Sequence, residues 1–201
     1  MNLIHKEDFE QWVKGHHIRI EEGGGYGYPL VFDSKITHGR YWPVPQPAGA
    51  TAFFFAKMLE GLDPWEKCWL WSDAQIWDLG SDKHARDTDQ VLATIMRKMG
   101  IPEGFTGAIQ YTRDEFQDVL TIFCSQVAYG WTVTNHIYVI PDDGKGMVFT
   151  NHCDDLVHAE FLDENRLQEY IRYLAKHDIK LPDKPPDASL KPEDWMNPNA
   201  N

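Results

Sequence analysis

The spacing of apolar residues along the chain switches between the period of a helix and the period of a strand. Apolar side chains that recur every three to four residues predict helices, and alternating or continuous apolar runs predict strands. The predicted helices cover residues 6–14, 50–61, 89–99, 112–127 and 163–174. The predicted strands cover residues 16–21, 28–33, 67–72, 75–79, 107–111, 131–140, 147–150 and 155–162.

The ends of several elements carry their own signals. Thr112 and Glu115 have the spacing of a capping box, in which each side chain binds a backbone amide that the first helical turn leaves without a partner. Asp163 is placed to cap the last helix in the same way. Prolines at 43, 45 and 47 predict an extended connection before residue 50.

The order of these elements predicts the fold class. Strands that follow one another through short turns, as at residues 131–150, favour antiparallel pairing. We therefore predict an α+β fold, with a mostly antiparallel sheet and helices packed on one face. Residues 1–180 are expected to form a single domain, and the proline-rich residues 181–201 an extended or disordered tail.

Composition limits the classes of partner. The 201 residues are 42% hydrophobic and carry a formal net charge of −12, which disfavours binding to nucleic acid or to an anionic membrane. That charge favours a basic protein partner, although acidity also serves solubility alone. No apolar run is long enough for a membrane span, the N-terminus has no secretory signal, and the three cysteines form no CxxC pair. We expect a cytoplasmic protein with reduced thiols.

One polar cluster, at residues 151–160, contains residue types that bind metals. His152, Asp155 and His158 are candidate ligands, because imidazole and carboxylate groups hold zinc and other divalent ions. Their spacing matches no HExxH, HxxxH or CxxC pattern. The simpler interpretation is a turn leading into a half-exposed strand, so we predict no metal site and no cofactor.

A second group of polar residues follows one face of the predicted strands. His136 and Tyr138 alternate with apolar residues on one strand, and His158 and Glu160 do so on another. In one sheet these side chains would converge on the face that the helices leave open, where a histidine beside a glutamate can act as a general acid or base. The same face could bind a protein or simply meet water. His17 and Arg19 would extend it.

The tryptophans at 65, 69, 71 and 77 raise one further alternative. Aromatic rings can form a stacking platform for bases or sugars, but their position around an apolar strand favours core packing.

The chain resembles a known class of proteins in its general character and in the order of three segments. These are Trp69-Leu70-Trp71-Ser72-Asp73, Tyr129-Gly130-Trp131 and Val157-His158-Ala159-Glu160-Phe161. Over residues 65–175 the chain resembles the small acidic immunity proteins of bacterial polymorphic-toxin systems. The resemblance implies a protein without catalytic activity that neutralises a toxin by occluding its surface. The alternative is a histidine-dependent or metal-assisted hydrolase that uses His136, His152, Asp155 and His158, with Glu160 as a base.

Overall fold

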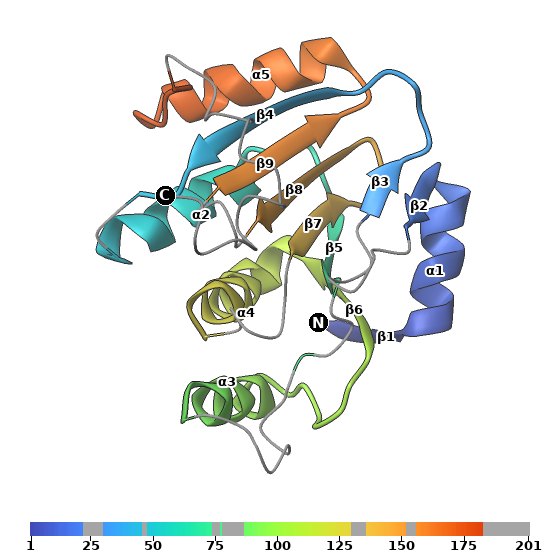
Figure 1. Ribbon diagram of the computed structural model, residues 1–201, viewed down its shortest axis with the longest axis vertical. Helices are drawn as coiled ribbons and strands as arrows, with labels where there is room; N and C mark the ends of the chain where they lie inside the picture. The colour runs from blue at the N-terminus through green and yellow to red at the C-terminus, as the bar shows by residue number, and fades with distance from the viewer. Residues whose placement is uncertain are drawn as a thin grey trace, which may run out of the picture.

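The protein forms one α+β domain, in agreement with the predicted fold class. The computed structural model describes residues 1–21, 30–45, 48–73, 77, 87–129, 136–151 and 156–182 (Figure 1). The predicted tail from residue 183 onward and the predicted strand at 75–79, except Trp77, lie outside these ranges.

A seven-stranded antiparallel sheet forms the centre of the domain. Its spatial order is β1-β6-β5-β7-β8-β9-β4, so the strand predicted at residues 67–72 is an inner strand, as its apolar pattern indicates. A separate two-stranded sheet pairs β2 with β3. The strands are β1 Asn2–His5, β2 Ile18–Ile20, β3 Leu30–Phe32, β4 His38–Pro43, β5 Lys67–Ser72, β6 Gly107–Thr112, β7 Ile137–Pro141, β8 Gly146–Asn151 and β9 Leu156–Phe161.

The helices cover the two faces of the sheet unequally. Four helices, α2 (Ala48–Glu60), α3 (Asp87–Lys98), α4 (Phe116–Tyr129) and α5 (Glu164–Ala175), share a core with one face. The first helix, α1 (Lys6–Gly15), lies on the opposite face together with the β2–β3 pair (Figure 1). The alternation of β5 shows the division, because Leu70 belongs to the first core and Trp69 and Trp71 belong to the second.

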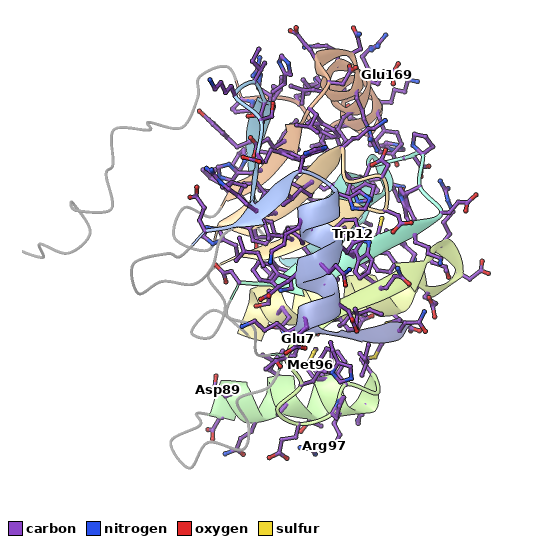
Figure 2. All side chains as sticks on the ribbon, turned by 90° about the vertical axis from the view of Figure 1, so that its right-hand side faces the viewer. Glu7, Trp12, Asp89, Met96, Arg97 and Glu169 are labelled. Atoms are coloured by element: carbon purple, nitrogen blue, oxygen red, sulfur yellow. The ribbon has the colours of Figure 1, made fainter. Side chains whose placement is uncertain are left out.

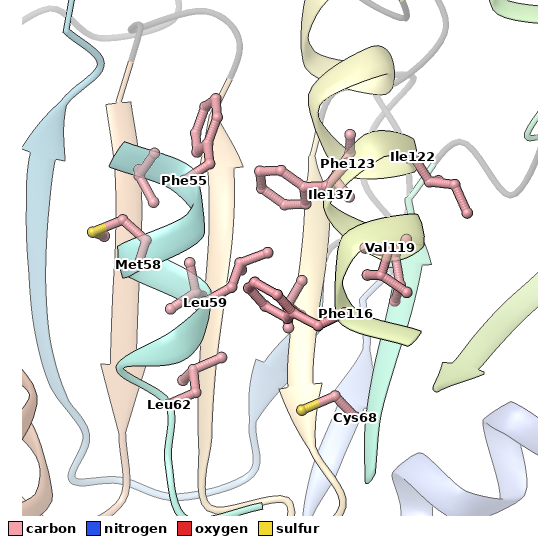
Figure 3. Close-up of a cluster of buried hydrophobic side chains, with 14 of the residues drawn as sticks. Phe55, Met58, Leu59, Leu62, Cys68, Phe116, Val119, Ile122, Phe123 and Ile137 are labelled. Atoms are coloured by element: carbon pink, nitrogen blue, oxygen red, sulfur yellow. The ribbon is translucent and has the colours of Figure 1, made fainter. Parts of the chain in front are cut away.

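The core under the four helices is the larger of the two. Phe55, Met58 and Leu59 of α2 and Phe123 of α4 point towards the strands, where Ile137 of β7 meets them (Figure 3). Phe55 and Phe123 pack edge to face, with ring centroids 5.0 Å apart. Burial of this apolar surface orders the helices on the sheet.

The smaller core holds α1 against the opposite face (Figure 2). Phe9 is fully buried and stacks on Trp71 with ring centroids 5.6 Å apart. Trp12, one helical turn further, contacts Trp69 at 4.6 Å. The apolar stripe predicted for residues 6–14 therefore faces the aromatic side of β5.

Both predicted caps are present. The backbone N–H of Thr112 donates to Glu115 Oε2, after which a short 3-10 turn at Arg113–Glu115 leads into α4. Asp163 Oδ1 accepts from the N–H groups of Asn165 and Arg166 at the start of α5. Within the described ranges, no helix combines the length and the hydropathy needed to cross a bilayer.

Candidate functional site

Three hydrogen bonds join Asp73 to His136. Asp73 follows β5 and is fully buried, and His136 precedes β7 on the neighbouring strand with 24% of its side chain exposed. Asp73 Oδ2 lies 2.7 Å from His136 Nδ1, and Oδ1 accepts the His136 backbone N–H at 3.0 Å. The Asp73 N–H donates in turn to the His136 carbonyl oxygen at 3.2 Å. Backbone and side chain together fix the imidazole ring.

This geometry assigns the two ring nitrogens of His136. An ionised carboxylate only accepts hydrogen bonds, so the proton of a neutral ring lies on Nδ1, facing Asp73. The other nitrogen, Nε2, then carries the lone pair. His136 thereby presents a hydrogen-bond acceptor that can also take a proton.

Beside His136, a row of rings crosses the sheet from strand to strand. We call Trp71, Tyr138, Phe149, His158 and Tyr41 the aromatic row; they occupy matching positions on β5, β7, β8, β9 and β4. Phe149 stacks on Tyr138 and on His158, with centroids 4.9 Å apart and planes 24° and 13° from parallel. His136 contacts Tyr138 at 6.0 Å and Phe149 at 6.2 Å.

The orientation of these rings decides what they can bind. The 4.9 Å spacing of Tyr138, Phe149 and His158 equals the distance between neighbouring strands, so these three rings stack face to face along the sheet and turn their edges outward. The outer rings of the row are tilted against their neighbours, by 48° at Trp71 and 55° at Tyr41. Stacking on a base or a sugar requires an exposed face. The tryptophans considered as a platform are also buried, with 0–8% of each exposed at Trp65, Trp69, Trp71 and Trp77. They are core residues.

The residues predicted for catalysis come only partly together. His136 and His158 both contact Phe149, but β8 separates their strands, which places the backbones about 9–10 Å apart. Tyr138 lies in the smaller core, where burial raises the pKa of its phenol far above the neutral range. Glu160 lies on β9 on the same face as His158, and is half-buried opposite Met147.

The remaining predicted residues lie elsewhere. His152 and Asp155 fall outside the described residues. Among the described residues, no group of three His, Cys, Asp or Glu side chains is arranged to hold a metal ion. Arg19 of β2 forms ion pairs with Glu21 and Asp33, and His17 is exposed just before that strand.

A second polar region lies at the end of the sheet where β5, β8 and α4 begin. Because neighbouring strands are antiparallel, the loop before β5, the turn after β6, the β7–β8 turn and the start of α5 meet at this end. We call it the acidic end, since nine carboxylates outnumber four side-chain cations there. The carboxylates are Asp63, Glu66, Asp114, Glu115, Asp118, Asp142, Asp143, Asp163 and Glu164, and the cations are Lys67, Arg113, Lys145 and Arg166.

Ion pairs neutralise the acidic end only in part. Asp63 pairs with Arg113, Glu115 pairs with the N-terminal ammonium group of Met1, and Asp143 pairs with Arg166 at 2.6 Å. Glu66 and Asp114 are exposed and form no ion pair among the described residues. The excess negative charge also acts on the interior. Burial raises the pKa of the Cys68 thiol, and the charges of nearby carboxylates at 63, 142 and 143 raise it further.

An open pocket of about 360 Å³ lies within the acidic end. Pro64, Trp65 and Glu66, from the loop before β5, form one wall, and Asp142 and Asp143, from the β7–β8 turn, form the other. Asp142 is oriented by Trp69, whose Nε1 donates to Oδ1 at 2.9 Å. The Arg113 guanidinium lies over the Trp65 ring, 5.0 Å from its centroid. The pocket thus combines an aromatic wall with three carboxylates.

Comparison of the chain with models of protein families, with curated proteins and with solved structures finds no match. The site is therefore interpreted from its own geometry.

Sequence reasoning misses Asp73, which is the partner that fixes His136. The sequence pattern predicts only a turn after β5 at this residue, and 63 positions separate it from its partner. The available signal is the place of Asp73 at the end of an inner apolar strand, after Ser72, because a carboxylate that is buried there needs a partner.

Proposed function

We propose that this protein binds a basic protein partner at its acidic end, in a function that needs no catalytic step. The observation that supports the proposal is the excess of carboxylates on the four connections at one end of the sheet, around the pocket beside Trp65. Opposite charges steer two proteins together and fix their orientation. Pro64, together with the 8% of Trp65 that stays exposed, offers an apolar wall for the stem of a lysine or arginine side chain from the partner.

The mode of action we propose is occlusion. An immunity protein neutralises a toxin by covering the surface that the toxin needs, and a toxin that acts on nucleic acid presents a basic surface for this purpose. The acidic end would compete for that surface as a mimic of a polyanion. This activity requires binding only, with no chemical step in the inhibitor.

The experiment compares two double variants with equal changes in charge. Glu66→Lys with Asp114→Lys reverses two exposed carboxylates at the acidic end, and Glu7→Lys with Glu103→Lys reverses two exposed carboxylates at the other end of the sheet. The binding partner in the assay is the purified product of the gene adjacent to this one. Association rates are measured by surface plasmon resonance at 50 mM and 300 mM salt.

We expect the acidic-end variant to lower the association rate about tenfold or more at low salt, and the control variant to change it less than about twofold. The same acidic-end variant should fail to protect cells that express the adjacent gene. Equal effects of the two variants, or no binding by the unaltered protein, would refute the proposal.

A further inference from the structure

We infer that His136 is a general base for the hydrolysis of small esters, with Asp73 as the residue that positions its ring. This activity is independent of the partner proposed above, because it lies at the opposite end of the sheet from the acidic end. It rests on the two-point contact between the carboxylate and the histidine, not on the cluster at residues 151–160.

The carboxylate of Asp73 is fully buried. Loss of its hydration is strongly unfavourable unless the carboxylate is paired. One carboxylate oxygen, Oδ1, accepts the backbone N–H of His136 and so joins the end of β5 to the start of β7. The second oxygen, Oδ2, is directed at the imidazole, 2.7 Å from Nδ1. This contact does for the ring what a base-orienting carboxylate does: it selects the tautomer and stabilises the imidazolium once formed.

The surroundings of the ring indicate the class of substrate. His136 keeps 24% of its side chain exposed, so its ring remains accessible to a small molecule. Phe149 and Tyr138 flank the ring with centroids near 6 Å, and Phe149 is only half-buried. Tyr138 is buried, so an ester with a flat apolar group can pack only against Phe149, in the edge-to-face geometry that aromatic pairs prefer.

His136 Nε2 takes a proton from a water molecule while the water oxygen bonds to the ester carbonyl carbon, which gives a tetrahedral intermediate. The carbon–oxygen bond to the leaving group then breaks, and the imidazolium returns its proton to the departing alkoxide or phenoxide. The products are one carboxylic acid and one alcohol or phenol, and His136 is regenerated.

The test uses 4-nitrophenyl benzoate with the full-length protein. His136→Gln should lower kcat/KM at least about 100-fold, the lower limit for removal of a general base. The matched control is His177→Gln, which removes a histidine beside Tyr173 at the end of α5 and should leave the rate within about twofold. A rate that is equal in the two variants would overturn the inference, because ester hydrolysis would then come from surface histidines in general.

Asp73→Asn tests the positioning role separately. The asparagine amide donates to Nδ1, so the ring proton moves to Nε2. In the ¹⁵N spectrum, Nδ1 of His136 should then show the chemical shift of an unprotonated nitrogen and Nε2 that of a protonated one. The value of kcat should fall at least about tenfold with little change in KM. Unchanged ¹⁵N resonances in a folded variant would contradict the role of Asp73. The acidic-end double variant should hydrolyse the ester at the rate of the unaltered protein. A loss of partner binding can therefore be distinguished from a loss of ester hydrolysis.

Discussion

Gly107→Ala should destabilise the protein more than the same substitution at any other glycine that the structure describes. Gly107 begins β6 with φ at +139°, a region that residues with a side chain rarely enter. A Cβ atom there would overlap the carbonyl oxygen of Ile4, which lies on the adjacent strand β1. The obstacle is backbone, so no change of side-chain rotamer relieves it.

The magnitude follows from two costs. The unfavourable backbone conformation costs about 1–3 kcal/mol. Displacing β1 to admit the methyl group costs about 1–3 kcal/mol more, as for other overpacked sites. The free energy of unfolding should therefore fall by about 2–6 kcal/mol, a large share of the 5–15 kcal/mol typical of a domain. Trp77, whose Nε1 donates to the Gly107 carbonyl at 3.0 Å, should report the displacement.

The assay is urea unfolding followed by tryptophan fluorescence. Gly15→Ala is the control, because Gly15 lies in the last turn of α1 and an added methyl group would meet no atom within 4 Å. That variant should gain about 0.4–1 kcal/mol through the lower entropy of its unfolded chain. If the free energy of unfolding of Gly107→Ala lies within about 0.5 kcal/mol of that of the unaltered protein, the close approach of β1 to β6 is wrong.

Two further predictions concern a helix cap and the response to alkaline pH. Asp163→Ala should cost about 1 kcal/mol in thermal unfolding, whereas Asp163→Ser, which can still accept from the first amides of α5, should retain most of that stability. Burial raises the pKa values of Cys68, Tyr111, Tyr138 and Tyr170. The unfolded chain therefore loses these protons first, and the free energy of unfolding should decrease as the pH rises above about 9–10, by up to about 1.4 kcal/mol per pH unit for each group. Tyr170→Phe should make this slope shallower, and an unchanged slope above pH 10 would show that Tyr170 is not buried.

The elements with strong periodicity are predictable from the sequence, and those that depend on long-range pairing are not. The α4 helix begins close to its predicted start because its capping box is local. In contrast, the sequence pattern predicts no element over residues 38–42, and Pro43 and the prolines after it predict an extended connection, so β4 is missed. Proline is tolerated there because β4 is the outer strand of the sheet. The strand β1 has only four residues, and their mostly exposed side chains show no alternation.

The same reasoning explains which part of the candidate site is predictable. Alternation along β7 and β9 places His136 and His158 on one face of the sheet, since period two is a local property of a strand. Strand order is not local, and it determines that Phe149 of β8 lies between them. The acidic end likewise arises only when four separate connections meet.

The pairing of β4 with β9 has a consequence for the synthesis of the chain. Tyr41 and His158 are partners in the sheet, yet 117 residues separate them. At a translation rate of about 5–20 residues per second, β4 waits roughly 6–23 s on the ribosome before its partner strand is made. During that interval neither β9, which pairs with β4, nor α5, whose Tyr170 packs on the fully buried Trp42, has yet been made. The nascent chain should therefore be a client of chaperones that bind exposed apolar segments until its last helix has been made.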